Sequence, residues 1–381
     1  MSGFGFTEAQ EMFRRQVESF ARRELLPGAR ERRREGRLPR EIVKRAADLG
    51  YMAINAPAEY GGQPADWITL GIAVEELAKV ELLVSCLSSW PSFAAVLLQD
   101  NPDLLQEWIP ALVRGERLLC LALTEPDCGS DAAAIRTRAL RDGDDYILQG
   151  EKTPVSLAMH ADGVIAFAKT DPDAGAQGVS SFLVPFDLPG IERSPHAMMG
   201  WNSMGQASIL LDGVRVPSRY LLGEEGGIFG TIMKQFDSNR VYLSLQVLGM
   251  AQTSLEEAIA YAQQRTAFGQ AIAKFEGVSF KIAEAATLVE AARLLCYRTL
   301  WLKDQGLPHT RESAMCKWLA PQVAVRTIHD CLLIHGHVGY SEEYDLERRL
   351  RDAICFEIAD GMAQIMKLIV ARNIWGREFI P

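Results

Sequence analysis

Residues 123–131 read LTEPDCGSD, and the character of the sequence changes on either side of them. Before this stretch, residues 7–120 carry apolar side chains at helical spacing. After it, as far as about residue 222, short β-rich runs are separated by Gly, Asp, Pro and Ser. Helical spacing returns from residue 226 onward. The sequence therefore predicts helices, then a small β-domain, then a second set of helices.

Local patterns define the individual elements. Residues 7–10, TEAQ, have the form of a capping box, in which a Thr and a Gln side chain satisfy each other's backbone at a helix start. The helix that follows carries apolar residues on one face, and Pro27 is expected to end it. Five runs are predicted to form β-structure: Tyr146–Leu148, Val164–Ala168, Phe182–Val184, Ile209–Leu211 and Val214–Val216.

Length and charge limit the class of protein. The chain has 381 residues, of which 48% are hydrophobic. A chain of this length usually needs more than one hydrophobic core, so we expect domains at residues 1–120, 121–225 and 226–381. The net charge of -9 argues against an extended nucleic-acid surface. The basic run at residues 30–37, RERRREGR, is better explained as a solvated face or loop.

The sequence shows no targeting segment and no metal motif. The first residues, MSGFGFTEAQ, do not join a basic region to an apolar one, and no stretch reaches about 18 uninterrupted apolar residues. We therefore expect a cytoplasmic protein that is neither secreted nor membrane-spanning. Seven cysteines are scattered without a CxxC pair, which predicts reduced, mostly buried thiols. His335 and His337 match no usual zinc spacing, so no metal is predicted.

Two polar segments have simple structural explanations. Residues 351–372, RDAICFEIADGMAQIMKLIVAR, carry Asp360 just before a predicted final helix. On local pattern alone, an Asp-Gly step at this place is an N-cap that accepts hydrogen bonds from backbone NH groups. Residues 236–240, FDSNR, place Asp237 and Arg240 three apart, where they can form an ion pair on a helix.

Taken together and in order, the segments resemble the motifs of the acyl-CoA dehydrogenase family. Residues 123–131 are similar to TEPGxGSD, residues 236–240 to F-D-x-x-R, and residues 265–269, RTAFG, to R-x-x-F-G. Residues 351–372 resemble the family's C-terminal motif, with Asp360 in place of the usual catalytic glutamate. An ordered set of motifs is more specific than any one of them. The resemblance implies an α+β, mostly α fold with an N-terminal helical domain, a central β-barrel-like domain and a C-terminal four-helix bundle.

The resemblance also implies FAD as the cofactor. Hydroxyl and backbone NH donors in a loop suit an electron-rich ring edge or a pyrophosphate. Residues 150–156, GEKTPVS, resemble G-x-K-x-W-I-T, and residues 333–340, LIHGHVGY, are similar to Q-I-x-G-G-x-G-Y. Pro154 and Leu333 replace the Trp and the Gln of these motifs. The residues implied in FAD binding are Leu123, Thr124, Gly129, Ser130, Pro154, Ser156, Arg265, Phe268, Leu333, Gly336 and Met362, of which Arg265 and Phe268 would reach the flavin of a neighbouring subunit.

An acyl-CoA thioester is the implied substrate, and Asp360 the implied catalytic base. Some family branches carry the base one residue before the arginine of F-D-x-x-R, but Asn239 cannot accept a proton there, which leaves Asp360 alone. The apolar neighbours Ile358 and Ala359 are expected to desolvate Asp360 and raise its basicity. The residues implied in substrate binding are Ser130, Phe236, Asp237, Asn239, Arg240 and Gly361, and no metal is involved.

The implied reaction is α,β-dehydrogenation to an enoyl-CoA. The aspartate and the segment GEKTPVSLAMHAD at residues 150–162 look most like the cyclohexanecarboxyl-CoA dehydrogenase branch, so a bulky or alicyclic acyl group is expected. Three alternatives stay open: a flavin oxidase similar to nitroalkane oxidase, an acyl-carrier-protein-linked dehydrogenase of a biosynthetic pathway, and a catalytically silent or nucleic-acid-associated relative that keeps the fold as a binding module. By the resemblance we expect a homotetramer, built as a dimer of dimers, and an electron-transferring flavoprotein as the acceptor.

Overall fold

A computed structural model describes residues 5–36 and 39–380 of the chain. The described residues divide into two compact units, both discontinuous in sequence. The first unit falls within Met1–Pro27, Asp66–Ser85 and Phe236–Pro381, and the second within Gly28–Ala65 and Cys86–Gln235. The three domains proposed from the sequence, at residues 1–120, 121–225 and 226–381, therefore remain a prediction.

The amino-terminal helix begins as predicted. The helix α1 spans Glu8–Phe20 and continues as a π-helical turn over Ala21–Leu25. At its start, the Thr7 hydroxyl accepts from the Gln10 backbone NH at 3.2 Å, and the Gln10 side chain accepts from the Thr7 NH at 3.0 Å. The capping box is therefore confirmed. Val17 and Phe20 are buried, so the apolar face of the helix packs into the first unit.

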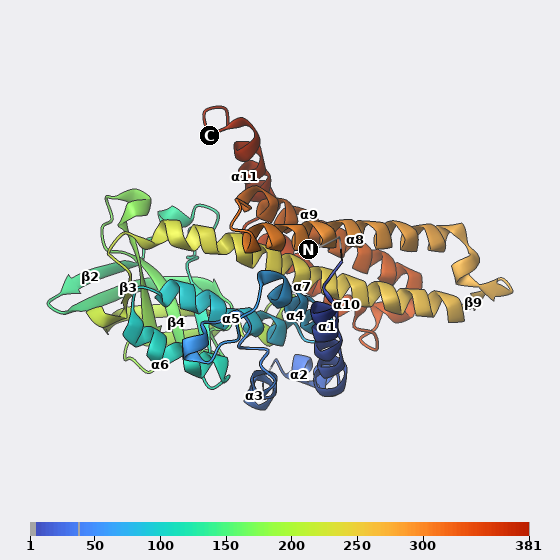
Figure 1. The fold of residues 1–381 in the computed structure, drawn as a ribbon, viewed down its shortest axis with the longest axis horizontal. Coiled ribbons are helices and arrows are strands. Elements are labelled where there is room, and N and C mark those ends of the chain that lie inside the picture. Colours follow the sequence, from blue (N-terminus) through green and yellow to red (C-terminus); the bar gives the residue numbers. More distant parts are fainter. Residues whose placement is uncertain (1–4, 37–38, 381) are drawn as a thin grey trace. The chain divides into compact units, whose positions relative to one another are not determined.

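The rest of the first unit is helical. The helix α9 contacts α8, α10 and α11, and Figure 1 shows these helices gathered together in orange and red. A cluster of buried apolar residues, including Leu255, Ala285 and Leu346, joins α7, α8 and α10. The helices are α4 at Trp67–Ala78, α7 at Ile228–Gln264, α8 at Glu276–Asp304, α9 at Thr310–His335, α10 at Leu346–Ile358 and α11 at Ala363–Trp375. Two helices pass from one unit into the other. Helix α5, Leu82–Leu98, starts in the first unit and ends in the second, whereas α7 starts in the second unit and ends in the first.

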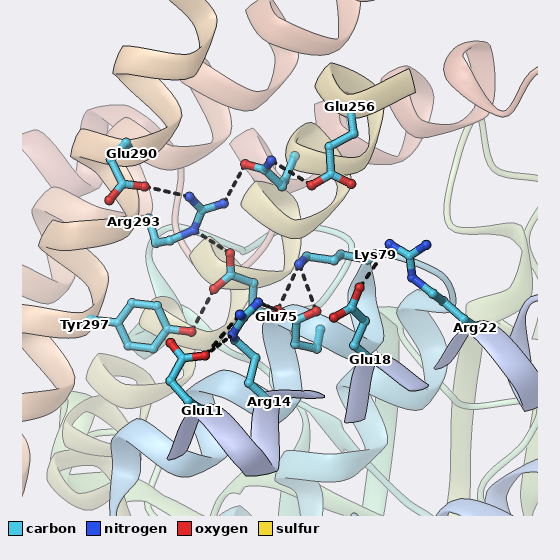
Figure 2. Close-up of polar contacts among 12 residues, drawn as sticks. Glu11, Arg14, Glu18, Arg22, Glu75, Lys79, Glu256, Glu290, Arg293 and Tyr297 are labelled. Carbon is cyan, nitrogen blue, oxygen red and sulfur yellow. Dashed lines mark hydrogen bonds and ion pairs between the residues drawn. The ribbon is translucent and has the colours of Figure 1, made fainter. Parts of the chain in front are cut away.

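A buried polar network joins α4 to α8 (Figure 2). Glu75 is only 4% exposed, and its two carboxylate oxygens accept from Arg293 Nε and from the Tyr297 hydroxyl, each at 2.7 Å. Burial alone would lower the pKa of Arg293, but the adjacent Glu75 carboxylate raises it. Burial, reinforced by Glu75, raises the pKa of Tyr297 well above its ordinary value. Arg293 therefore stays a cation and Tyr297 a neutral phenol, and both donate hydrogen bonds to the buried Glu75 side chain.

The second unit is built on an eight-stranded sheet. The strand order is β6-β7-β3-β2-β4-β5-β8, and β1 pairs in parallel with β4. Every residue of β4 is buried, and the Phe167 and Phe182 side chains are fully covered. The strands are β1 at Leu119–Ala122, β2 at Arg138–Asp142, β3 at Asp145–Val155, β4 at Gly163–Lys169, β5 at Val179–Pro185, β6 at Ile191–Pro195, β7 at Ala207–Pro217 and β8 at Leu221–Leu222.

Short helices accompany this sheet within the second unit. They are α2 at Ala29–Glu35, α3 at Arg40–Asp48 and α6 at Pro102–Val113. The described part of the basic run at residues 30–37 lies mainly in α2, while residue 37 is outside the described residues. A two-stranded hairpin of β9, Thr266–Ala267, and β10, Gln270–Ala271, follows α7 in the first unit.

The predicted order of helices, β-structure and helices is confirmed. All five predicted β-runs lie in strands, although Ile209–Leu211 and Val214–Val216 belong to the single strand β7. That strand is continuous because its partners β3 and β6 pair with it on both sides. Among the described residues, no helix is both long and apolar enough to cross a membrane.

Candidate active site

Asp360 lies in a tight turn between two helices of the first unit. Helix α10 ends at Ile358, and α11 begins at Ala363 with Met362 in the N-cap position. The N-cap explanation for Asp360 is therefore wrong. Its backbone is left-handed, with a φ of 54°, and Gly361 has a φ of 108°. L-residues rarely adopt this conformation, so the surroundings must hold it in place.

The carboxylate of Asp360 has a specific partner. The Asn239 side-chain amide, on α7, donates a hydrogen bond to Asp360 Oδ2. Next to it, Arg240 Nε donates to the backbone carbonyl of Asp360 at 3.3 Å. Two consecutive residues of α7 thus hold both the carboxylate and the backbone of Asp360, which itself is half-buried.

The predicted desolvation by neighbouring residues is wrong. Ile358 is 59% exposed, because it lies at the end of α10 and turns away from the buried side of that helix. Ala359 is half-buried. Within this chain, the surroundings of Asp360 are set by hydrogen-bond donors rather than by the two apolar residues before it.

The ion pair that the sequence allowed between Asp237 and Arg240 is present. Arg240 Nη1 lies 3.0 Å from Asp237 Oδ1, and both side chains are less than one-tenth exposed. The other oxygen, Asp237 Oδ2, accepts from the Thr310 hydroxyl at 2.6 Å. Phe236 is half-buried, and the Arg240 guanidinium lies 6.0 Å from the centre of its ring. A role in CoA binding for these residues remains a proposal.

The loop at residues 123–131 follows strand β1 in the second unit. Glu125 and Cys128 close it by mutual backbone hydrogen bonds of 3.0 and 3.2 Å. Lys152, on β3, is fully buried and reaches into this loop, where its ammonium lies 2.6 Å from Glu125 Oε1 and 3.1 Å from the Leu123 carbonyl. The loop is therefore fixed to strand β3 by the buried ion pair between Lys152 and Glu125.

Glu125 is held ionised by its neighbours. Burial would raise its pKa, but the Lys152 ammonium outweighs that effect, together with hydrogen bonds from the Arg136 and Thr137 backbone NH groups at 2.5 and 3.0 Å. The pKa of Glu125 is consequently below its ordinary value. The sequence motif drew attention to this loop, whereas Lys152, four residues before Ser156, was not singled out as its anchor.

The predicted FAD residues of the second unit offer suitable donors. The Thr124 and Ser130 hydroxyls make no side-chain hydrogen bond within residues 5–36 and 39–380, and Gly129 and Ser130 are exposed. Pro154 is exposed on β3. The Ser156 hydroxyl accepts from Gln206 Nε2 at 3.4 Å, and Gln206 Oε1 is buried without a partner among the described atoms. Hydroxyls, amides and an open loop backbone fit the polar edge of a flavin and its phosphates.

The predicted FAD residues of the first unit are largely exposed. Arg265 directly follows α7 and has no ion pair within the described part of the chain, and Phe268, at the tip of the β9–β10 hairpin, is 96% exposed. Leu333 is 52% exposed on α9, Gly336 has a φ of 64° at the end of that helix, and Met362 is 42% exposed. A guanidinium without an ion pair and an exposed aromatic ring three residues later fit an anionic, ring-bearing ligand.

The thiols and the metal prediction can be compared directly with the structure. All seven cysteines are free, and six of them are buried, as the sequence predicted. No group of His, Cys, Asp or Glu side chains among the described residues is arranged to hold a metal ion.

Comparison with known proteins decides the family. Its three domain models match in order: the N-terminal domain of acyl-CoA dehydrogenase over residues 7–116, the middle domain over residues 120–214 and the C-terminal domain over residues 227–375. The chain belongs to the acyl-CoA dehydrogenase family. Members of the family depend on FAD, so this chain is an FAD-dependent acyl-CoA dehydrogenase.

Known relatives align with almost the whole chain. The short-chain specific acyl-CoA dehydrogenase of Bos taurus mitochondria is 36% identical, over 96% of this chain and 90% of that protein. The CarC subunit of the caffeyl-CoA reductase-Etf complex of Acetobacterium woodii is 34% identical, over 96% and 98%. The structure of butyryl-CoA dehydrogenase from Megasphaera elsdenii superimposes with a TM-score of 0.93 at 31% identity, over 98% and 99%. The expected acyl-CoA dehydrogenase fold is therefore confirmed.

Proposed function

We propose that Asp360 is the base that removes the α-proton of the acyl-CoA thioester. The supporting observation is that its carboxylate is half-buried and is oriented by the Asn239 amide, while Arg240 holds its backbone. A base works efficiently when it is fixed within hydrogen-bond reach of the proton it removes. Bound FAD supplies the acceptor for the hydride that leaves the β-carbon. Asn239 cannot accept a proton, so its part in the reaction is to orient the carboxylate.

The length of the base favours an unusual acyl group. Aspartate is shorter than glutamate by one methylene, about 1.5 Å, and a misplacement of about 1 Å can cost roughly a hundredfold in rate. The α-carbon of the substrate must therefore come closer to the backbone at Asp360 than a glutamate would require. We propose a bulky or alicyclic acyl group, such as cyclohexanecarboxyl-CoA, which is also supported by the resemblance of residues 150–162 to that branch.

Anaerobic titration of the purified, FAD-loaded protein tests the substrate. We expect cyclohexanecarboxyl-CoA to bleach the flavin absorption band at least tenfold faster than butyryl-CoA or octanoyl-CoA, because its α-carbon is proposed to lie closer to Asp360. A tenfold difference in rate corresponds to about 1.4 kcal/mol in transition-state binding. Bleaching by the straight-chain thioesters alone would exclude the alicyclic group. Oxygen consumption with a nitroalkane, and none with any thioester, would exclude the dehydrogenase reaction in favour of the oxidase alternative.

The remaining contacts are proposals on the same footing. Leu123, Thr124, Gly129 and Ser130 would hold FAD with backbone and hydroxyl donors. The Ser156 hydroxyl would donate beside the ring, whereas Pro154, which has no NH group, would only pack there. Exposed Arg265 and Phe268 would bind the flavin of a second copy in a homotetramer, with Leu333, Gly336 and Met362 near the nucleotide. Phe236, Asp237, Arg240 and Gly361 would line the path of CoA. An electron-transferring flavoprotein is the proposed acceptor, which the CarC relative's membership of an Etf complex supports.

Asn239→Asp tests the orienting role of Asn239. This change replaces a donor by a second carboxylate in contact with Asp360, and two carboxylates sharing one site hold a proton between them to higher pH. We expect the acid limb of the kcat/KM profile to move up by about one pH unit. Asn373→Asp is a matched control, since Asn373 is exposed on α11 and donates only to the Ile369 carbonyl. If the acid limb of the kcat/KM profile lies at the same pH in both variants and in the wild type, the side chain of residue 239 does not act on the Asp360 carboxylate during the reaction.

A further inference from the structure

Lys317 is a buried cation that joins the two ends of the Asp360 turn. It lies in the middle of α9, is 1% exposed, and is surrounded in sequence by apolar residues. Its ammonium donates to the carbonyl of Phe356 at 2.5 Å and to the carbonyl of Gly361 at 3.2 Å. Phe356 belongs to the last turn of α10, where backbone carbonyls have no partner within the helix. One side chain thus bridges the end of α10 and the residue after Asp360.

The turn needs such support because its backbone is unfavourable. Asp360 has a positive φ, which L-residues rarely adopt, whereas Gly361 tolerates its own positive φ because it has no Cβ. A Cβ added to Gly361 would come within 2.5 Å of the Met366 methyl group. A strained conformation of this kind costs roughly 1–3 kcal/mol and persists only where the surrounding contacts fix it. Arg240 holds the carbonyl of Asp360 from α7, and Lys317 holds the carbonyls on either side of it from α9.

We propose that Lys317 is a positioning residue for proton abstraction, which fixes the distance of the Asp360 carboxylate from the substrate through the backbone of residues 356–361. This role rests on the proposed function, because it requires Asp360 to be the base. A shorter base has less freedom to compensate for a shift of its backbone, so an aspartate enzyme depends on this anchor more than a glutamate enzyme would.

The charge of Lys317 gives the role a pH signature. Burial lowers the pKa of Lys317 to about 8; the negative charges of Asp360 and Glu357 oppose that shift, and Arg240 adds to it. The neighbouring Cys355 thiol is neutral in this range, because burial raises its pKa to about 12. These groups face Lys317 from the turn, from α10 and from α7. Above about pH 8 the side chain becomes a neutral amine, and its hydrogen bonds to the two carbonyls weaken. We therefore expect the limiting rate of flavin reduction to fall on the alkaline side of pH 8.

Stability should change in the opposite direction. In the unfolded chain a lysine keeps its ordinary pKa near 10.5, so between about pH 8 and pH 10.5 the unfolded state binds more protons than the folded state. The contribution of Lys317 to the free energy of unfolding consequently rises with pH in that window. A loss of rate above pH 8 that accompanies this gain cannot be explained by unfolding.

The test compares Lys317→Met with Lys303→Met. Lys303 is half-buried, and desolvation lowers its pKa to about 8 as well, but it donates to Ser238, lies 3.4 Å from the centre of the Trp67 ring and holds no part of the Asp360 turn. Both variants are purified with FAD, checked for flavin content and circular dichroism, and mixed anaerobically with the acyl-CoA that bleaches the wild type. We expect Lys317→Met to reduce its flavin roughly a hundredfold more slowly, with a KM near that of the wild type, whereas Lys303→Met reacts at the wild-type rate.

Lys317→Arg keeps the proposal testable if the methionine variant does not fold. Arginine stays charged to high pH, so the alkaline fall near pH 8 should disappear in the folded, FAD-loaded arginine variant. An unchanged rate in folded Lys317→Met, or an alkaline fall that persists in Lys317→Arg, would overturn the positioning role. If no acyl-CoA bleaches the wild-type flavin, the proposed function fails instead, and the two failures are thereby distinguished.

Discussion

Asp360→Asn should leave a folded, yellow, thioester-binding protein that no longer reduces its flavin at a useful rate. Asparagine has the shape of aspartate but cannot take up the α-proton, and a positioned general base contributes roughly a hundredfold to ten-thousandfold to a rate. We expect the limiting rate of anaerobic flavin reduction to fall by about a thousandfold, while KM changes little. Exchange of the substrate's α-proton with deuterated water should be lost in parallel.

Glu357→Gln is the control for this change. Glu357 is a half-buried carboxylate in the same segment, and it makes no hydrogen bond or ion pair within the described residues. It should keep a rate within a few-fold of the wild type. Near-normal turnover in Asp360→Asn, with FAD bound, would mean that another group removes the proton. Since Asn239 cannot do so, that result would also remove the reason for an orienting amide beside Asp360.

Lys152→Met should cause a large loss of stability in the second unit. It leaves the Glu125 carboxylate, 7% exposed, without its cation. Removing one partner of a buried ion pair typically costs about 3–5 kcal/mol. Because Glu125 and Leu123 belong to the loop that would hold FAD, the variant should also release FAD at a lower denaturant concentration. Urea unfolding followed by circular dichroism and by flavin fluorescence measures the two effects separately.

The double variant Lys152→Met with Glu125→Gln separates charge from packing. Glutamine carries no charge, but its single carbonyl oxygen can replace only one of the two Glu125 oxygens that accept from the Arg136 and Thr137 NH groups, so part of the lost stability should return. The sign of the pH dependence provides a second check. The pKa of Glu125 is depressed in the folded state, so its stabilising contribution is present above about pH 4.5 and is lost as the pH falls through the folded value. The gap between wild type and Lys152→Met should therefore close in acid.

Arg215→Met is the control for a salt bridge in the same sheet. Arg215 lies 2.9 Å from Asp145, and both are more than a quarter exposed. An exposed pair in water contributes little, so the unfolding curve should barely move. Equal losses in Arg215→Met and Lys152→Met would show that burial of the Glu125 pair is not what makes it important.

Features that depend on neighbours in sequence were predictable. The capping box at Thr7 and Gln10 forms within one helical turn, and the β-runs alternate with turn residues, so each could be recognised from a short window. The ordered motifs then supplied the family and its fold. Asp360 itself was found in this way, as a departure from a familiar pattern.

The supports of Asp360 could not be predicted in the same way, because they come from distant helices. Asn239 lies 121 residues before Asp360, and Lys317 lies 44 residues before Gly361. Asn239 was considered only as a missing base, and the lone lysine within the apolar run at residues 314–320 was an available but weak signal. The expectation about Ile358 was wrong for a related reason. An apolar neighbour in sequence covers a group only if the helix turns it inward, and α10 turns Ile358 outward.

The discontinuity of the two units determines when each can form during synthesis. Apart from the segment at Asp66–Ser85, the second unit is a continuous stretch of chain that is complete once Gln235 has been made. The first unit must wait, since its early segments have their partners near the carboxyl end. Glu75 is made 218 residues before Arg293, the cation that compensates its charge in Figure 2. For most of translation, the nascent chain therefore carries α1 and α4 without the helices that pack against them in the folded first unit, so their apolar faces stay exposed during that interval.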